Sequence, residues 1–191
     1  MEKQEFILET KEKALLLKIA RESLEHYLLT GRYIDYDDNI LPIILLTKTG
    51  AFVSLQKGNA LRGCVGNFKS DKPLYQLIQE MVVAAALRDK RFPPVRYGEL
   101  NQIKIEVSVL SPLERINCEE ELELGKHGIY IKKGNNSGTF LPQVATTTGW
   151  SKEEFIGFCS KNKACIGYDG WREAELYVYT AQVFSEKELR I

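Results

Sequence analysis

The sequence predicts an α+β fold in which most strands pair antiparallel. Helical and alternating apolar patterns follow one another along the 191 residues without the regular strand-helix-strand alternation of a parallel sheet. Glycine-containing segments at residues 57–59 and 134–138 each separate two extended runs, which is typical of β-hairpins. No repeat, low-complexity tract or flexible linker divides the chain. We therefore expect a single domain that spans residues 1–191.

The first predicted elements are a helix and a hairpin. Apolar residues recur at helical spacing over residues 11–29, and Gly31 follows as a plausible C-terminal stop. Apolar and polar residues then alternate over residues 51–56, and residues 61–68 resume an extended pattern after the turn. This order predicts an amphipathic first helix followed by two paired strands.

A second helix and a half-buried strand come next. An apolar stripe at helical spacing follows Pro73 and continues to about Arg88. The helix must end before Pro93-Pro94, because the residue before a proline is disfavoured in the α region. Apolar residues alternate with polar ones over residues 103–109, which predicts a strand with one buried face.

The last third of the chain carries turn, cap and alternation signals in quick succession. Pro142 suits the first position of a helix, and Ser151 with Glu154 forms a capping-box pattern. These signals predict strands over residues 128–133 and 139–141, a short helix from Pro142 to about Gly149, a helix from Ser151 to about Lys161, and a terminal strand over residues 176–181.

The composition excludes several classes of protein. Hydrophobic residues make up 44% and charged residues 27%, and 26 basic residues balance 26 acidic ones. Such a chain is neither disordered by composition nor held to nucleic acid by bulk charge, so RNA binding is the least favoured function. No apolar run approaches the roughly 20 residues that span a bilayer, and no secretory leader is recognisable, so we expect a cytoplasmic protein.

The four cysteines do not form a recognisable metal or redox motif. Cys64, Cys118, Cys159 and Cys165 lack the paired spacing of a zinc site and of a redox C-x-x-C sequence. The sequence therefore predicts no metal site, identifies no cofactor and assigns no role to the last three cysteines.

The segment around Cys64 is the most informative one for function. Gly63 and Gly66 flank the thiol, and glycine inside a strand often marks the close approach of a ligand or of another backbone. Arg62 is two residues from Cys64, so strand alternation predicts that both share one face, where the arginine can favour a thiolate or hold an anion. The alternative is that the glycines make room for a packed neighbour and that Cys64 is a core residue.

Three further positions are candidate site residues. The arginines around the Pro93-Pro94 loop, Arg91 among them, either complement the end of the preceding helix or form a basic rim for a carboxylate or phosphate. Asp89 is better suited to anchor this loop to an arginine than to act as a base. His127, flanked by glycines at a strand entrance, can activate a thiol, although a lone histidine is usually structural.

The ordered motifs of the chain closely resemble those of the AMMECR-one domain family. They are Leu61-Arg62-Gly63-Cys64-Val65-Gly66, Asp89-x-Arg91-Phe92-Pro93-Pro94, Glu106-Val107-Ser108-Val109-Leu110-Ser111-Pro112, His127-Gly128-Ile129 and Leu141-Pro142-Gln143-Val144-Ala145. The resemblance covers most of the chain and implies two interlocked lobes, mainly antiparallel sheet with packed helices. It also implies that the Arg-Gly-Cys-x-Gly strand lines a functional cleft. Relatives often carry a glycine where this chain has Cys165.

The family resemblance further implies that the chain acts alongside a MEMO-type protein and a radical SAM protein. We predict a cytosolic enzyme or enzyme-complex component with Cys64 as nucleophile or redox thiol and His127 as its base. Predicted ligand-binding positions are Arg62, Gly63, Gly66, Asp89, Arg91, Glu106 and Gln143. The alternative is a non-catalytic interaction module that uses the same cleft, with the glycines exposing a strand edge.

The charge distribution is consistent with a local anionic ligand. Residues 61–98 contain seven Lys or Arg against three Asp or Glu, so a positive excess coincides with the Cys64 strand and the double-proline loop. A small anionic ligand or an acidic partner surface is therefore the predicted binding partner of this region.

Overall fold

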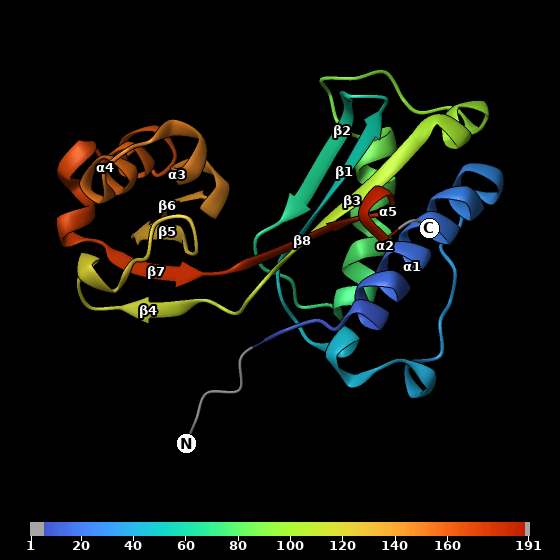
Figure 1. The fold of residues 1–191 in the computed structure, drawn as a ribbon, viewed down its shortest axis with the longest axis horizontal. Coiled ribbons are helices and arrows are strands. Elements are labelled where there is room, and N and C mark those ends of the chain that lie inside the picture. The colour runs from blue at the N-terminus through green and yellow to red at the C-terminus, as the bar shows by residue number, and fades with distance from the viewer. Residues whose placement is uncertain (1–5, 190–191) are drawn as a thin grey trace. The chain divides into compact units, whose positions relative to one another are not determined.

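A computed structural model describes residues 6–189 and confirms the predicted α+β class. The chain divides into two compact units (Figure 1). The first unit ends at Leu110 and resumes at Gln182, and the second comprises Ser111–Ala181. Each unit is built around its own four-stranded sheet, with strand orders β2-β1-β3-β8 and β4-β7-β5-β6.

The first unit contains the predicted first helix, hairpin, second helix and half-buried strand. Gly31 ends α1 in the left-handed conformation, as the sequence predicted. The bounds are α1 Thr10–Thr30, β1 Ala51–Lys57, β2 Ala60–Asn67, α2 Leu74–Leu87, β3 Ile103–Leu110, β8 Ala181–Ser185 and α5 Glu186–Leu189, with 3-10 turns η1 Asp38–Ile40, η2 Ile43–Leu46 and η3 Tyr97–Gln102.

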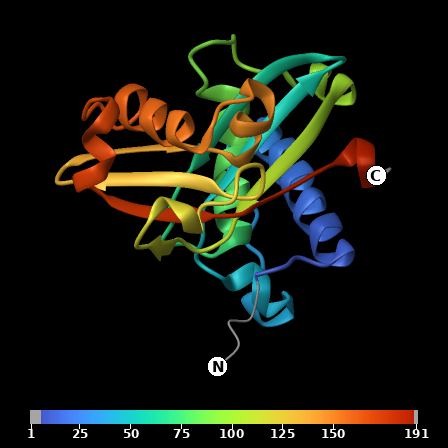
Figure 2. The same cartoon turned by 60° about the vertical axis from the view of Figure 1, so that its left-hand side comes forward.

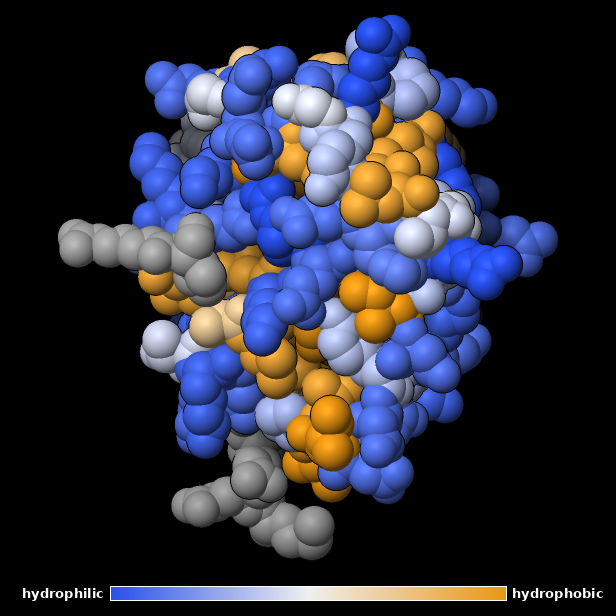
Figure 3. All heavy atoms as spheres, turned by 90° about the vertical axis from the view of Figure 1, so that its right-hand side faces the viewer, coloured by the Kyte–Doolittle hydropathy of each residue, from blue (hydrophilic) through white to orange (hydrophobic). Residues whose placement is uncertain are grey.

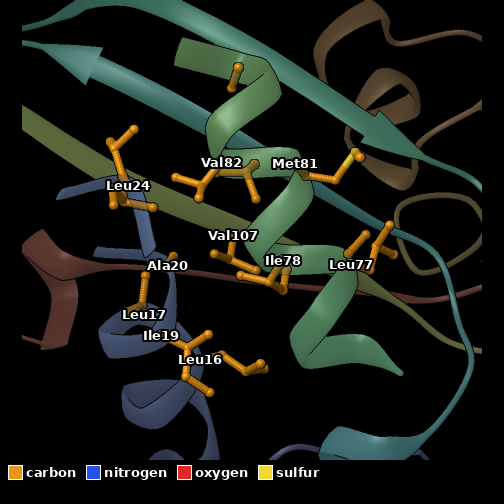
Figure 4. Close-up of a cluster of buried hydrophobic side chains, with 14 of the residues drawn as sticks. Leu16, Leu17, Ile19, Ala20, Leu24, Leu77, Ile78, Met81, Val82 and Val107 are labelled. Carbon is orange, nitrogen blue, oxygen red and sulfur yellow. The ribbon is translucent and has the colours of Figure 1, made fainter. Parts of the chain in front are cut away.

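Helices α1 and α2 pack on one face of the first sheet (Figures 1 and 2). The alternating apolar residues of β1 and β3 point to this face and are fully buried, with Val53 and Ile105 as examples. Leu17 and Leu24 of α1 and Ile78 of α2 belong to the same buried cluster (Figure 4). The buried apolar surface therefore fixes which side chains of the sheet point to the helices and which point away.

The second unit confirms the predicted hairpin, the short helix and the capping box. Ser151 Oγ accepts the amide hydrogen of Glu154 at 3.3 Å, and the Glu154 carboxylate accepts that of Ser151 at 2.9 Å. The bounds are β4 Glu114–Ile116, β5 Gly128–Lys133, β6 Asn136–Phe140, α3 Pro142–Thr148, α4 Lys152–Asn162 and β7 Glu175–Tyr179, with 3-10 turns η4 Glu119–Glu121 and η5 Tyr168–Glu173.

The predicted terminal strand over residues 176–181 is confirmed as far as Tyr179, but the chain then continues into a second strand of the other sheet. The extended segment contributes β7 to the second sheet and β8 to the first, with Thr180 between them. Thr180 exchanges two hydrogen bonds of 2.9 Å with Ser111, which secures the chain where the first strand ends. Val178 is buried in the core of the second unit and Phe184 in that of the first, so each part follows its own core.

No helix within residues 6–189 is long and apolar enough to cross a membrane.

Candidate functional site

A row of three polar side chains crosses the first sheet on the face opposite to α1 and α2. Ser54 of the central strand β1 lies directly opposite Cys64 of β2 on one side and Glu106 of β3 on the other. Directly opposed residues point to the same face, with Cβ atoms about 5 Å apart. All three residues are half-buried. We call Cys64, Ser54 and Glu106 the thiol row.

The thiol row joins a sulfur, a hydroxyl and a carboxyl group. Ser54 Oγ donates a hydrogen bond to Cys64 Sγ at 3.2 Å. The Glu106 side chain makes no hydrogen bond or ion pair with any described residue. Burial, with a smaller contribution from Glu188 on α5, raises the pKa of Glu106 above its usual range. Such a carboxyl group binds a proton more readily than an exposed one.

The backbone of Cys64 is held by the loop that follows α2. The Cys64 amide donates to Asp89 Oδ2 at 2.8 Å, and Arg91 Nη2 donates to the Cys64 carbonyl at 3.2 Å. Arg91 also donates to both carboxylate oxygens of Asp89, at 2.9 and 2.7 Å. The Arg91 guanidinium is the largest cause that holds the pKa of Asp89 well below its usual range. We call this pair the Asp89–Arg91 clasp.

The Asp89–Arg91 clasp prevents strand addition at this position of the sheet edge. β2 is an edge strand, because only β1 pairs with it in the sheet. At Cys64 both outward-facing backbone groups are already bound by Asp89 and Arg91. The predicted free strand edge is therefore wrong at Cys64, where an added strand would first have to displace the clasp.

Arg62 does not share the surroundings of Cys64. The register of β1 and β2 shifts between Leu55 and Gln56, which leaves Arg62 as the extra residue of a β-bulge. Its guanidinium pairs with Glu99 at 3.1 Å and donates to the carbonyl of Pro93 at 2.7 Å.

The Arg62 side chain is only 12% exposed. Arg62 lowers the pKa of Glu99 to about 2. It therefore serves as a link between the bulge and the double-proline loop, and the prediction that Arg62 faces an anion beside the thiol is not supported by its contacts.

The two glycines beside Cys64 accommodate packed neighbours. A Cβ at Gly63 would lie 2.1 Å from the carbonyl oxygen of Ala85, so α2 crosses β2 at this glycine. A Cβ at Gly66 would lie 2.2 Å from the ring of Phe52. Both contacts agree with the packing alternative for the glycines, whereas Cys64 itself is not a core residue.

His127 and Gln143 belong to the second unit. His127 precedes β5, and its Nδ1 accepts the amide hydrogen of Glu123 at 3.2 Å, which closes a local turn. Gln143 is exposed on the first turn of α3. The structure therefore groups Cys64, Asp89, Arg91 and Glu106 in the first unit, and the roles of His127 and Gln143 remain predictions.

The remaining cysteines have different surroundings. Cys159 is fully buried in the second core, and burial raises its pKa to about 12. Cys118 and Cys165 are exposed. The described part of the chain contains no group of three or more His, Cys, Asp and Glu side chains that could hold a metal ion.

A groove of about 600 Å³ lies elsewhere in the first unit, between α1 and the segment from η3 into β3. Arg21 and Glu186 line it and form an ion pair of 2.6 Å. Figure 3 views the side on which α1 lies and shows apolar patches set among polar side chains. None of the predicted site residues lines this groove.

The two sheets with their packed helices, and the cysteine held at the edge of one sheet, define a two-unit α+β protein with a candidate thiol site. The model of the AMMECR1 family matches residues 17–184, and the chain belongs to this family, which is the AMMECR-one family named above.

Similar proteins come from archaea. Protein MK0488 of Methanopyrus kandleri is 38% identical over 95% of this chain and 91% of its own length. Protein PF1979 of Pyrococcus furiosus is 39% identical over 90% of this chain and 87% of its own length. The crystal structure of the uncharacterized protein PH0010 from Pyrococcus horikoshii is 35% identical and matches with a TM-score of 0.77, over 91% of this chain and 90% of its own.

Sequence reasoning missed Ser54. The turn pairs Lys57 with Ala60 and Gln56 with Leu61, and an unbroken hairpin would continue with Ser54 opposite Gly63. The bulge shifts the register by one residue and brings Ser54 opposite Cys64. Glycines in the second strand were the only available signal of such a break.

Proposed function

We propose that this chain is an enzyme, or a component of an enzyme complex, in which the Cys64 thiol reacts with a small anionic substrate. The observation that carries the proposal is the hydrogen bond of 3.2 Å between Ser54 and Cys64, on a backbone that the Asp89–Arg91 clasp fixes. A reactive thiol needs a polar, partly accessible environment, and this is the surrounding that Cys64 has.

Arg91 supports the anionic character of the substrate. Nε and Nη2 of Arg91 are held by hydrogen bonds to Asp89. The Arg91 side chain nevertheless remains 58% exposed, and its Nη1 donates no hydrogen bond to a described residue. A guanidinium that is held in place with free N–H groups can bind a carboxylate or phosphate. The resemblance adds the proposal that the chain works alongside a MEMO-type protein and a radical SAM protein, with a role for His127.

The test compares cysteines within one molecule. The native protein is treated with limiting iodoacetamide near neutral pH, and the modified peptides are quantified by mass spectrometry. We expect Cys64 to react at least about tenfold faster than exposed Cys165, because an activated thiol is more nucleophilic than an ordinary one. The margin over exposed Cys118 should be wider, because the hydrogen bond of Cys118 with Glu120 raises the pKa of that thiol. Buried Cys159 serves as the unreactive reference. A Cys64 rate at or below that of Cys118 contradicts the proposal.

A charged reagent tests the role of Arg91. Iodoacetate carries the carboxylate that iodoacetamide lacks, so the ratio of the two rates reports anion binding beside the sulfur. We expect this ratio to be higher at Cys64 than at Cys118 and to fall in Arg91→Gln, while Arg91→Lys retains part of it. Equal ratios at both cysteines contradict an anionic substrate.

The alternative of a non-catalytic docking module makes the opposite prediction. It requires no activated thiol, so Cys64 should then react like Cys118. This alternative would be supported if a purified MEMO-type or radical SAM partner binds the chain and if Cys64→Ser leaves that binding unchanged.

A further inference from the structure

We infer that Glu106 accepts the proton of Cys64 through the Ser54 hydroxyl when the thiol attacks its substrate. This inference rests on the proposed thiol function and adds two named roles to it. Glu106 is the proton acceptor, and Ser54 is the residue that passes the proton.

The sheet places the three groups in the required order. Ser54 lies on the central strand, opposite Cys64 of β2 and opposite Glu106 of β3. Its Oγ already contacts Cys64 Sγ at 3.2 Å. A serine hydroxyl rotates freely and both donates and accepts a hydrogen bond, so it can take the thiol proton and release its own. Directly opposed residues have Cβ atoms about 5 Å apart, a spacing that a side-chain rotation or one water molecule can bridge between Ser54 and Glu106.

Glu106 differs from the other half-buried or buried carboxylates around it. Asp89 pairs with Arg91, Glu99 pairs with Arg62, and Glu186 pairs with Arg21. The arginine partners hold the pKa of Asp89 and of Glu99 below the usual ranges, so these two carboxylates are poor proton acceptors, and Glu186 is engaged in its ion pair with Arg21. The Glu106 side chain makes no hydrogen bond or ion pair within residues 6–189, and it lies on the same face as the thiol.

The charged groups around the thiol row favour Glu106 as the proton acceptor. Glu188 of α5 opposes the negative charge of Glu106, and burial acts in the same direction, so its pKa is raised from the usual value. Lys104 lies two residues away on the same strand and is exposed. At the other end of the thiol row Arg91 Nη2 donates to the Cys64 carbonyl. Protonation of Glu106 as the sulfur reacts therefore removes a negative charge that lies near Glu188.

The proton and electron balance is simple. The sulfur forms a bond to an electrophilic carbon of the substrate while the S–H bond breaks, and the leaving group departs with its electron pair. The thiol proton passes to Ser54 Oγ, and the hydroxyl proton of Ser54 passes to a Glu106 carboxylate oxygen. Neither oxidation nor reduction occurs, and Glu106 holds a proton that it can return to the leaving group.

The test measures the rate of Cys64 alkylation by neutral iodoacetamide from mildly acidic to alkaline pH. Ser54→Ala and Glu106→Gln should each lower the rate near neutral pH by at least about tenfold, a conservative threshold because general-base catalysis typically contributes about a hundredfold or more. At about pH 10, where a thiol ionises without help, both variants should match the wild type. Ser54→Thr keeps the hydroxyl and should retain most of the rate. A structural defect would instead lower the rate at every pH.

Two control variants sharpen the result. Lys104→Gln changes a charge on the same strand and face but opposite Gln56, and it should leave the profile unchanged. The second variant, His127→Asn, removes the other candidate base, and a loss of rate there with none in Glu106→Gln overturns the inference in favour of His127. A Glu106→Gln rate equal to or above that of the wild type also overturns it.

The outcomes separate this inference from the proposed function. If wild-type Cys64 reacts faster than Cys118 while the Ser54 and Glu106 variants match it, the proton path is wrong and the thiol function stands. If wild-type Cys64 is no faster than Cys118, the thiol function itself fails.

Discussion

Replacing Gly63 with alanine tests whether this glycine serves packing. The added Cβ would lie 2.1 Å from the carbonyl oxygen of Ala85 and 3.0 Å from its carbonyl carbon. Both atoms belong to the backbone of α2, so no side-chain rotation relieves the overlap. An ordinary carbon to oxygen contact needs about 3.3 Å, so α2 must move away from β2 by about 1.2 Å.

The cost in unfolding free energy follows from the packing between α2 and the sheet that this movement loosens. The facing side of α2 carries Ile78 and Val82, both fully buried against the sheet. A gap of about 1 Å forfeits up to half of each dispersion contact, and overpacked cores typically lose about 1–3 kcal/mol. Replacing glycine within a strand returns less than about 1 kcal/mol of backbone entropy. We expect a net loss of about 2 kcal/mol in the free energy of unfolding.

The assay is thermal or urea unfolding of the full chain with circular dichroism and tryptophan fluorescence. A loss of about 2 kcal/mol corresponds to a Tm decrease of roughly 4–8 °C for a chain of this length. Gly98→Ala is the matched control, because a Cβ there meets no atom within 4 Å and its backbone is not left-handed. If Gly63→Ala is as stable as Gly98→Ala, the close approach of α2 does not explain the glycine, and a ligand becomes the better explanation.

Two further predictions concern stability. Cys165 is exposed with φ at +56°, in the left-handed region, so Cys165→Gly should raise the free energy of unfolding by up to about 1 kcal/mol in urea titrations, whereas Cys165→Ala, which keeps the Cβ, should not. Arg62 holds the pKa of Glu99 near 2 in the folded chain, below the ordinary value of 4.5, so its contribution is present above about pH 4.5 and is lost as the pH falls toward 2. The stability gap between wild type and Glu99→Gln should therefore shrink on acidification, and a gap that is constant with pH would show that the Arg62 pair is not its cause.

Elements with local signals were predicted well from the sequence. Gly31 ended α1 where it was expected, and the Ser151–Glu154 capping box opened α4 with both of its hydrogen bonds. The β1–β2 hairpin formed around its predicted turn. These features depend on residues close in sequence, whose preferences are expressed whatever the rest of the chain does.

The terminal strand shows where local signals fail. Alternation over residues 176–181 predicted an extended segment correctly, but not that it changes sheets at Thr180. The apolar residues of this segment contribute to two separate cores. Strand alternation alone does not indicate the residue at which the chain passes from one core to the other.

The sequence by itself determined the fold class and the family, and it predicted Cys64 as a candidate site residue. Only the tertiary structure decided what surrounds the thiol. In an unbroken hairpin Cys64 would oppose Val53 and point into the helix-covered core, but the bulge at Arg62 turns it to the other face, opposite Ser54. The physical reason is that strand side chains alternate with a period of two, so one extra residue exchanges the two faces for all that follow. The contacts that accompany this bulge, Arg62 with Glu99 and Asp89 with Cys64, join residues far apart in the sequence.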